Sequence, residues 1–387
     1  MDLSLSAEQQ MLQDSVSRFV QNDYDFQKRS RLVAAGLGGS PDTWRIFAEN
    51  GWLTAGFPED FGGFGEGAIE TALISQQLGR GLVVEPWLGS AVLATRTFLA
   101  SGSAAQLVEW LPSLGDGSLR LALAYGEAQS RGLPHIVAAR ADREGEGWRI
   151  NGKKNLVLGG AGADAFVVSA RTEGDLESRR GIGLFLVAAD APGLSVVPVR
   201  LCDGSVAAEV SLAAVPAVTL GDPTDGLIAL EHGLAHAVSA LCAELVGGME
   251  RSIEISAEYL RTRKQFGAPI ATFQSLQHRL ADMAAEMELA RSMLFVALAS
   301  IENDDVDTRR AVLSGAKAFI TTAARNVCGQ GIQLHGAIGM TEECAIGHYF
   351  VRAVVADAVL GGRSVHHAVC AEALQKRFVS KVRGGNA

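Results

Sequence analysis

The stretch Tyr259–Met283, YLRTRKQFGAPIATFQSLQHRLADM, governs how the second half of the chain folds. Phe266 is followed by Gly267 and Pro269, which predict the end of one helix and a turn of the chain. Apolar residues at helical spacing from Gln274 onward predict a second helix. Just before the turn, three cations lie within four residues: Arg261, Arg263 and Lys264.

Hydrogen-bond donors gathered at such a turn, with an aromatic ring beside them, suit a ligand made of a diphosphate and a flat ring system. The residues alone leave a second interpretation open. A solvated corner between two helices would carry the same cations without binding anything.

The predicted secondary structure changes twice along the chain, from helices to strands and back to helices. Residues 1–117 predict helices, and the first helix begins with a capping box of Ser6 and Gln9. Residues 118–222 predict short strands in an antiparallel sandwich or barrel, with a turn at Asn151-Gly152. Helical periodicity then returns for residues 223–387. Four long segments predict a four-helix bundle: 226–260, 271–303, 306–334 and 344–378.

Composition narrows the class of protein. The 387 residues are enough for two or three domains, and the net charge of −9 argues against nucleic acid as the main partner. The five cysteines are dispersed, without the spacing of a disulfide framework or a zinc site. No run of about 18 apolar residues predicts a membrane span, and the first residues lack the features of a signal peptide. We therefore expect a cytoplasmic protein without a bound metal.

Four motifs, in order along nearly the whole chain, resemble the signatures of the acyl-CoA dehydrogenase family. They are Pro58-Glu59-Asp60-Phe61-Gly62-Gly63, Ile150-Asn151-Gly152-Lys153-Lys154, Arg263-Lys264-Gln265-Phe266-Gly267 and Gln333-Leu334-His335-Gly336-Ala337-Ile338-Gly339. Within the family, the chain is most similar to small subunits of the pimeloyl-CoA dehydrogenase type. The resemblance implies an α+β multidomain fold with an N-terminal all-α domain (1–117), a central antiparallel β domain (118–222) and a C-terminal four-helix bundle (223–387).

The resemblance also implies FAD as cofactor and an acyl-CoA thioester as substrate. In the family, FAD lies between the β domain of one subunit and the bundle of its dimer mate. A carboxylate removes the α-proton while the flavin takes hydride from the β-carbon. On the bundle, the resemblance assigns Arg263 to the FAD diphosphate and Phe266 to the adenosine part. The residues assigned to the adenine end are Gln274, Gln333, Gly336 and Ala337.

The motifs that would hold FAD in this chain's own β domain are eroded. The family has Thr-Glu-Pro-x-x-Gly-Ser-Asp where this chain has Gly126–Leu133, GEAQSRGL, so most hydroxyl and glycine donors are lost. The Trp-Ile-Thr strand that contacts the flavin is replaced by Leu156-Val157-Leu158. At the position of the catalytic glutamate the chain has Gly361, which cannot accept a proton.

Two carboxylates remain as candidates for a relocated base. Glu244, on the first bundle helix, is expected in an apolar setting that would raise its pKa. Asp357 lies one helical turn before Gly361. The adjacent pair His366-His367 is expected at a surface or interface, because neighbouring residues on a helix do not share a face.

Three hypotheses follow from this pattern. The first is a base-lacking subunit of an α2β2 acyl-CoA dehydrogenase that completes the FAD site of a second, partner subunit. The second is a self-sufficient homotetramer with Glu244 as its base, and the third is a flavin-free scaffold or regulatory subunit. The resemblance also implies electron-transfer flavoprotein as a partner.

Overall fold

The computed structural model describes residues 5–36, 38–65, 67–303 and 305–384. These residues fall into two compact units. Unit 1 comprises the described residues within 1–15, 27–74 and 84–240, and unit 2 comprises those within 16–26, 75–83 and 241–387. Boundaries between the units fall inside α1 (Ala7–Asn22), α4 (Ala68–Arg80) and α7 (Leu227–Thr262), and after the first residue of the helix that begins at Phe26.

Short helices make up the N-terminal part of unit 1. They are α2 (Phe26–Ala35), α3 (Pro41–Glu49), η1 (Glu59–Phe61), the π-helical segment η2 (Trp87–Ala94), α5 (Thr95–Ser101) and α6 (Ala104–Gly115). The capping box predicted before α1 is confirmed. The Ser6 amide donates to Gln9 Oε1 at 3.0 Å, and the Gln9 amide donates to Ser6 Oγ at 3.1 Å.

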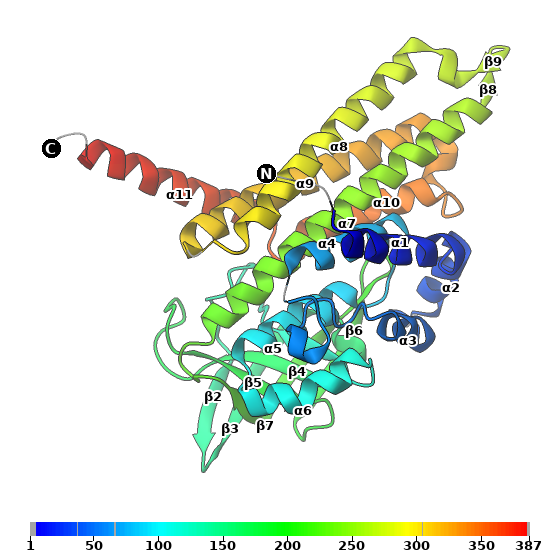
Figure 1. The fold of residues 1–387 in the computed structure, drawn as a ribbon. Coiled ribbons are helices and arrows are strands. Elements are labelled where there is room, and N and C mark those ends of the chain that lie inside the picture. Colours follow the sequence, from blue (N-terminus) through cyan, green and yellow to red (C-terminus); the bar gives the residue numbers. More distant parts are fainter. Residues whose placement is uncertain (1–4, 37, 66, 304, 385–387) are drawn as a thin grey trace. The chain divides into compact units, whose positions relative to one another are not determined.

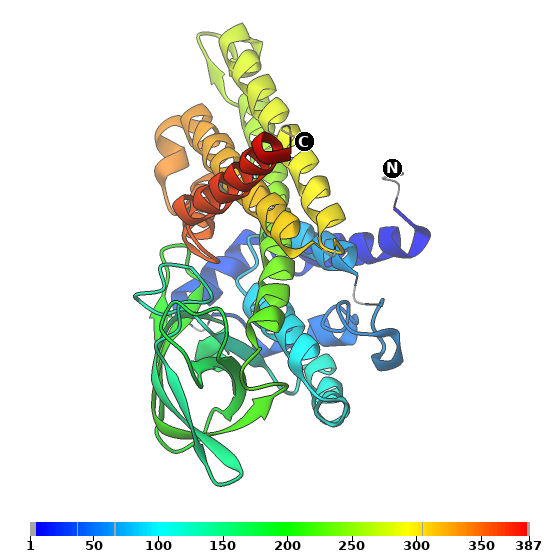
Figure 2. The same ribbon diagram turned by 90° about the vertical axis from the view of Figure 1, so that its left-hand side faces the viewer.

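The strands of unit 1 curl around a common interior, as Figure 2 shows. They are β1 (Leu121–Ala124), β2 (Arg140–Glu144), β3 (Gly147–Leu158), β4 (Ala165–Arg171), β5 (Ile182–Ala188), β6 (Leu194–Arg200) and β7 (Val206–Leu220), with the turn η3 (Gly160–Gly162) after β3. β5 pairs with both β4 and β7, β7 pairs with β3, and β3 pairs with β2. The single pair Arg140 with Arg171 then brings β2 back to β4. The sheet is mostly antiparallel, as expected, although β1 pairs with β4 in parallel.

One predicted turn is wrong. Asn151-Gly152 lies inside β3, where the register against β7 shifts between Ile150 and Gly152. A Cβ at position 152 would lie only 2.5 Å from Ala139 Cβ, so glycine is needed there for close approach of two chain segments. Asn151 Oδ1 accepts the Ala214 amide at 2.8 Å, which holds the irregular position in place. The Asn151-Gly152 pair therefore forms a β-bulge within a strand and not the turn of a hairpin.

The helices of unit 2 up to residue 358 lie side by side in a bundle, whereas the last helix points away from it toward the C-terminus (Figure 1). The second part of α7 is followed by strands β8 (Lys264–Gln265) and β9 (Ala268–Pro269), the turn η4 (Ile270–Thr272), and helices α8 (Gln274–Ser300) and α9 (Val306–His335). The turn η5 (Gly336–Met340) leads to α10 (Ala345–Ala358) and α11 (Arg363–Gly384). The segment predicted as one helix, 344–378, is thus two helices. They are separated where Leu360 and Gly361 adopt φ values of +56° and +91°, which a helix does not allow.

The end of α4 crosses α7 at backbone contact. A Cβ at Gly79 would lie 2.0 Å from the carbonyl oxygen of Glu244, and one at Gly247 would lie 1.9 Å from that of Gln76. Only glycine permits this approach, so the two glycines fix where α4 and α7 meet. This crossing belongs wholly to unit 2.

Candidate functional site

The cationic stretch that opened the sequence forms a two-stranded hairpin at one end of the bundle. β8 and β9 pair Lys264 with Pro269 and Gln265 with Ala268. The turn residues Phe266 and Gly267 have φ values of +53° and +82°, and positive φ at both central residues is the geometry of a type I′ turn. Phe266 is 92% exposed at this tip. The turn that the sequence predicted is present, with a paired hairpin around it that the sequence analysis did not identify.

Next to this hairpin, side-chain contacts join the end of α7, the start of α8 and the end of α9. Tyr259, near the end of α7, stacks on His335 at the end of α9, with ring centroids 4.4 Å apart and 23° between planes. Arg279, near the start of α8, hydrogen-bonds to Gln330 on α9. We call this region the hairpin end of unit 2. It carries all six residues predicted to bind FAD, and all six are exposed: Arg263, Phe266, Gln274, Gln333, Gly336 and Ala337.

The hairpin end has the groups that FAD needs. The side chain of Arg263 makes no hydrogen bond or ion pair with the described residues, so its guanidinium is available to a diphosphate. Gly336, with φ +67°, ends α9, and a Cβ there would meet nothing within 4 Å, so the backbone is open to a ligand. The exposed ring of Phe266 offers a flat apolar surface for stacking. The donor set therefore fits the FAD role predicted for it.

Glu244 is far from the hairpin end and is not in the setting that we expected. About 27 Å of helix, at a rise of about 1.5 Å per residue, separates it from Thr262, the last residue of α7. Its two carboxylate oxygens accept Arg352 Nε at 2.5 Å and Arg352 Nη2 at 3.0 Å. The expected apolar setting is therefore wrong, because a bidentate ion pair stabilises the charged carboxylate. A catalytic role for Glu244 remains a prediction.

Two buried side chains hold the loop around Gly361, which is the predicted position of the missing base. Lys317 Nζ, on α9, donates to the carbonyl oxygen of Gly361 at 2.5 Å, and Lys317 is 1% exposed. His366, on α11, has Nε2 at 3.1 Å from the carbonyl oxygen of Leu360, so this nitrogen carries the hydrogen. Its Nδ1 then accepts the hydroxyl of Ser314 at 3.1 Å. A neutral imidazole satisfies both contacts.

Burial sets the protonation of these two groups. Desolvation lowers the pKa of Lys317 to about 8, against smaller opposing effects of Cys242 and Asp357. Desolvation also lowers the pKa of His366 to about 4, and the charge of Lys317 adds to this. Gly361, the predicted position of the missing base, thus lies beside a buried lysine and a neutral histidine and contributes only its backbone. Sequence analysis missed Lys317, because one lysine in a long helix does not reveal that its side chain is buried.

The other candidates near this loop are engaged in ion pairs or face solvent. Asp357 Oδ2 lies 3.0 Å from Arg363 Nε and 3.4 Å from Arg325 Nη1. His367 is exposed while His366 is buried. The expectation that the two histidines do not share a face is confirmed, but His366 is not at the surface.

In unit 1, the loop that replaces the family's flavin motif is organised around a buried carboxylate. Glu127 pairs with Lys154 at 2.6 Å, and their side chains are 2% and 0% exposed. Its oxygens also accept the amides of Ala138 at 2.9 Å and Ala139 at 3.1 Å. Desolvation lowers the pKa of Lys154, and the charge of Glu127 opposes this. Lys154, the lysine of the Asn-Gly-x-Lys motif, therefore forms a buried ion pair inside the β domain.

The strand that replaces the flavin contact offers no side-chain hydrogen bond. Leu156 has φ +50° and is 39% exposed, at a register shift between Lys154 and Val157. Leu158 is packed closely enough that a Cβ on Gly89 would lie 2.5 Å from its carbonyl. Leucine side chains cannot donate or accept a hydrogen bond, so Leu156 and Leu158 do not supply the polar contact that the family motif would.

Among the residues that the structure describes, no group of three or more His, Cys, Asp or Glu side chains could hold a metal ion. None of the described helices is long and apolar enough to cross a membrane.

Comparison with known proteins places the chain among relatives of one kind. Family models match in three consecutive parts: "Acyl-CoA dehydrogenase, N-terminal domain" over 6–118, "Acyl-CoA dehydrogenase, middle domain" over 122–214 and "Acyl-CoA dehydrogenase, C-terminal domain" over 224–375. Acyl-CoA dehydrogenase FadE27 of Mycobacterium tuberculosis is 30% identical over 83% of this chain and 84% of its own length. Probable acyl-CoA dehydrogenase YngJ of Bacillus subtilis is 29% identical over 93% and 94%.

Solved structures agree with these matches. A variant of the "Tcur3481-Tcur3483 steroid ACAD" has a TM-score of 0.85 and 30% identity, covering 96% of this chain and 99% of that one. The ChsE4-ChsE5 complex from Mycobacterium tuberculosis has a TM-score of 0.85 and 27% identity, covering 97% and 99%. The predicted fold class, with an all-α, a β and a helical bundle part, is confirmed by these matches.

Proposed function

Because this chain belongs to the acyl-CoA dehydrogenase family, whose members are FAD-dependent oxidoreductases, we propose that it is the base-lacking subunit of an α2β2 heterotetramer. In this assembly it completes the FAD site of a second acyl-CoA dehydrogenase subunit. The observation that carries the proposal is an asymmetry. The hairpin end presents every predicted FAD contact at the surface, whereas the predicted base position is Gly361, whose carbonyl oxygen accepts a hydrogen bond from a buried lysine.

The chemistry assigned to the bound FAD is the removal of hydride from the β-carbon of an acyl-CoA thioester. The chain's own residues would hold that cofactor in the partner's site. Arg263 would pair with the diphosphate and Phe266 would lie against the adenosine part. The adenine end would be met by side-chain amides and open backbone: Gln274, Gln333, Gly336 and Ala337.

The glutamate that takes the α-proton would come from the partner subunit. Two of the similar solved structures support a mixed assembly, since each is described by two protein names, Tcur3481 with Tcur3483 and ChsE4 with ChsE5. Among small subunits, the motifs most resemble the pimeloyl-CoA dehydrogenase type. Electron-transfer flavoprotein is the proposed acceptor of the electrons, and the cytoplasm is the proposed compartment.

The decisive experiment measures the FAD content and native mass of this chain purified alone and together with the candidate partner. We expect little flavin in the chain alone and one FAD per pair in a mixed tetramer. Arg263→Ala should lower the FAD content of that tetramer. The matched control is Arg261→Ala, which removes a cation from the last turn of α7 and should leave the FAD content unchanged.

Other outcomes would support the competing hypotheses. One FAD per chain with dehydrogenase turnover by the chain alone would overturn the proposal and favour a self-sufficient homotetramer with Glu244 as base. Absence of FAD from every complex that the chain forms would favour a flavin-free scaffold or regulatory subunit.

A further inference from the structure

The predicted FAD contacts of the hairpin end come from segments that are far apart in the sequence. Arg263 and Phe266 belong to the hairpin that follows α7. Gln333, Gly336 and Ala337 lie at the end of α9 and in the turn η5. A single FAD can bind both segments well only if their spacing is fixed, so the contacts that fix it bear directly on the site proposed above.

Tyr259, in the last turn of α7, is joined to the hairpin through its backbone. Its carbonyl oxygen accepts the amide of Arg263 at 2.8 Å and the hydroxyl of Thr262 at 3.1 Å. The carbonyl oxygen of Arg263 then accepts the amide of Ile270 at 2.8 Å, which closes the hairpin. The backbone position of Tyr259 thus determines where the hairpin that carries Arg263 begins.

His335, at the end of α9, is joined in a similar way to the second segment. Its Nδ1 lies 2.8 Å from the carbonyl oxygen of Gly331, so this nitrogen carries the hydrogen and the ring has a fixed orientation. A Cβ at Gly339 would lie 3.0 Å from the Cβ of His335, so the turn η5 folds back against this histidine. His335 is 6% exposed, and desolvation lowers its pKa, which keeps the ring neutral at pH 7.

The two side chains meet in one contact, the stack of the Tyr259 ring on the His335 ring. Such ring pairs are favourable beyond the area that they bury, and they fix a relative orientation. The hydroxyl of Tyr259 makes no hydrogen bond with any residue that the structure describes. The ring face of Tyr259 is therefore the part of this side chain that joins the two segments.

We propose that Tyr259 and His335 are positioning residues of the FAD site, which hold the Arg263 hairpin and the turn after α9 at the spacing that one FAD requires. This inference rests on the proposed function, and neither residue is assigned a contact with FAD itself. Without the stack, the two segments can move independently, so FAD would have to order them as it binds and would bind more weakly.

The test measures the dissociation constant of FAD for the deflavinated mixed tetramer, by the change in flavin fluorescence. Tyr259→Leu should raise this constant about fivefold, whereas Tyr259→Phe keeps the ring and should bind FAD as wild type does. His335→Leu should raise the constant by a similar factor. Because both leucine changes break the same contact, the double variant should bind FAD no more weakly than the weaker of the two single variants.

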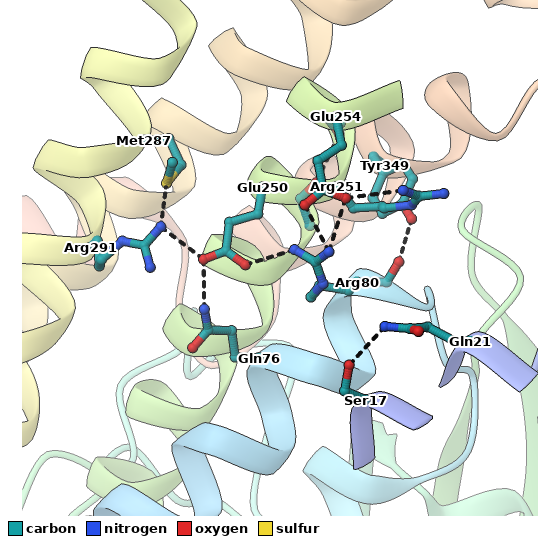
Figure 3. Close-up of polar contacts among 12 residues, drawn as sticks. Ser17, Gln21, Gln76, Arg80, Glu250, Arg251, Glu254, Met287, Arg291 and Tyr349 are labelled. Carbon is teal, nitrogen blue, oxygen red and sulfur yellow. Dashed lines mark hydrogen bonds and ion pairs between the residues drawn. The ribbon is translucent and has the colours of Figure 1, made fainter. Parts of the chain in front are cut away.

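A change elsewhere in unit 2 separates positioning from general stability. Arg291, on α8, pairs with Glu250 on α7 at 2.9 Å, within the network of ion pairs that Figure 3 shows. About 14 Å of helix, at a rise of about 1.5 Å per residue, separates Glu250 from Tyr259. Arg291→Met is therefore the matched control. It should lower the melting temperature of the tetramer and leave the dissociation constant of FAD unchanged.

The outcomes distinguish this inference from the proposed function. If Arg263→Ala weakens FAD binding and Tyr259→Leu does not, the proposed function stands and the positioning role is wrong. Equal weakening by Tyr259→Phe and Tyr259→Leu, additive effects in the double variant, or an equal loss of affinity in Arg291→Met would also overturn the positioning role. A mixed tetramer that binds no FAD would overturn the proposed function, and this inference with it.

Discussion

Lys317 donates a hydrogen bond of 2.5 Å to the carbonyl oxygen of Gly361, so a buried amine on α9 holds the backbone at the position predicted to correspond to the family's catalytic glutamate. The contact fixes the loop between α10 and α11 in a conformation with positive φ at both Leu360 and Gly361. A side chain introduced at residue 361 would therefore have to adopt a backbone conformation that this hydrogen bond maintains.

Replacing Gly361 by glutamate should not restore a base. Residue 361 has φ +91°, which side chains other than hydrogen adopt at a cost of about 1–3 kcal/mol. We expect Gly361→Glu to lower the free energy of unfolding by about that amount and to give no dehydrogenase turnover when the chain is assayed alone with FAD. Substantial turnover by this variant would show that the loop relaxes more easily than its geometry indicates.

Lys317 should make stability depend on pH in the alkaline range. Its pKa is about 8 in the folded chain against 10.5 as the ordinary value, so between these values the unfolded state binds more protons. The free energy of unfolding should therefore rise by about 3 kcal/mol from this group as pH increases through that window. Urea denaturation at pH 7.5 and pH 10 measures the rise in wild type.

The same comparison in Lys317→Met isolates the contribution of the amine. The variant has no group to titrate at this position, so the difference between wild type and variant should shrink toward high pH. An equal pH dependence in both proteins would contradict a lowered pKa of Lys317.

The pair Glu127–Lys154 should behave as a buried unit of the β domain. Lys154→Met leaves Glu127 charged in the interior and should cost about 3–5 kcal/mol of unfolding free energy. Adding Glu127→Gln removes the unpaired charge, so the double variant should be more stable than Lys154→Met. A double-mutant cycle by urea denaturation gives the coupling energy between Glu127 and Lys154. Additive effects of the two changes on the free energy of unfolding would contradict the interpretation of the pair as one unit.

Glu244 should prove to be a structural partner of Arg352. In the complex with the partner subunit, Glu244→Gln should keep its turnover and lose about 1–3 kcal/mol of unfolding free energy, because a charged hydrogen bond to Arg352 is weakened. Steady-state turnover and thermal unfolding of the same preparation measure both effects. Loss of turnover with unchanged stability would instead identify Glu244 as the relocated base.

Much of the architecture could be read from the sequence because it depends on local patterns. Helical spacing and the capping box of Ser6 and Gln9 predicted the helices, and short punctuated apolar runs predicted the β domain. The position of the bend near Gly267 was also predicted. The turn predicted at Asn151-Gly152 was wrong, because the residue types that form a hairpin turn also allow a bulge within a strand. They also allow another chain segment to approach the strand closely.

The order of amino acids was enough to establish the family resemblance, the succession of the three parts, the basic stretch around Arg263 and the absence of a carboxylate at Gly361. What surrounds those residues became visible only in the folded chain. There the Lys317 amine donates to the Gly361 carbonyl, Glu244 pairs with Arg352 and Glu127 pairs with Lys154. These contacts escape sequence analysis because hydrogen bonds and ion pairs join residues far apart in the chain. Their burial depends on packing between helices and strands, which residue spacing within a single element does not reveal.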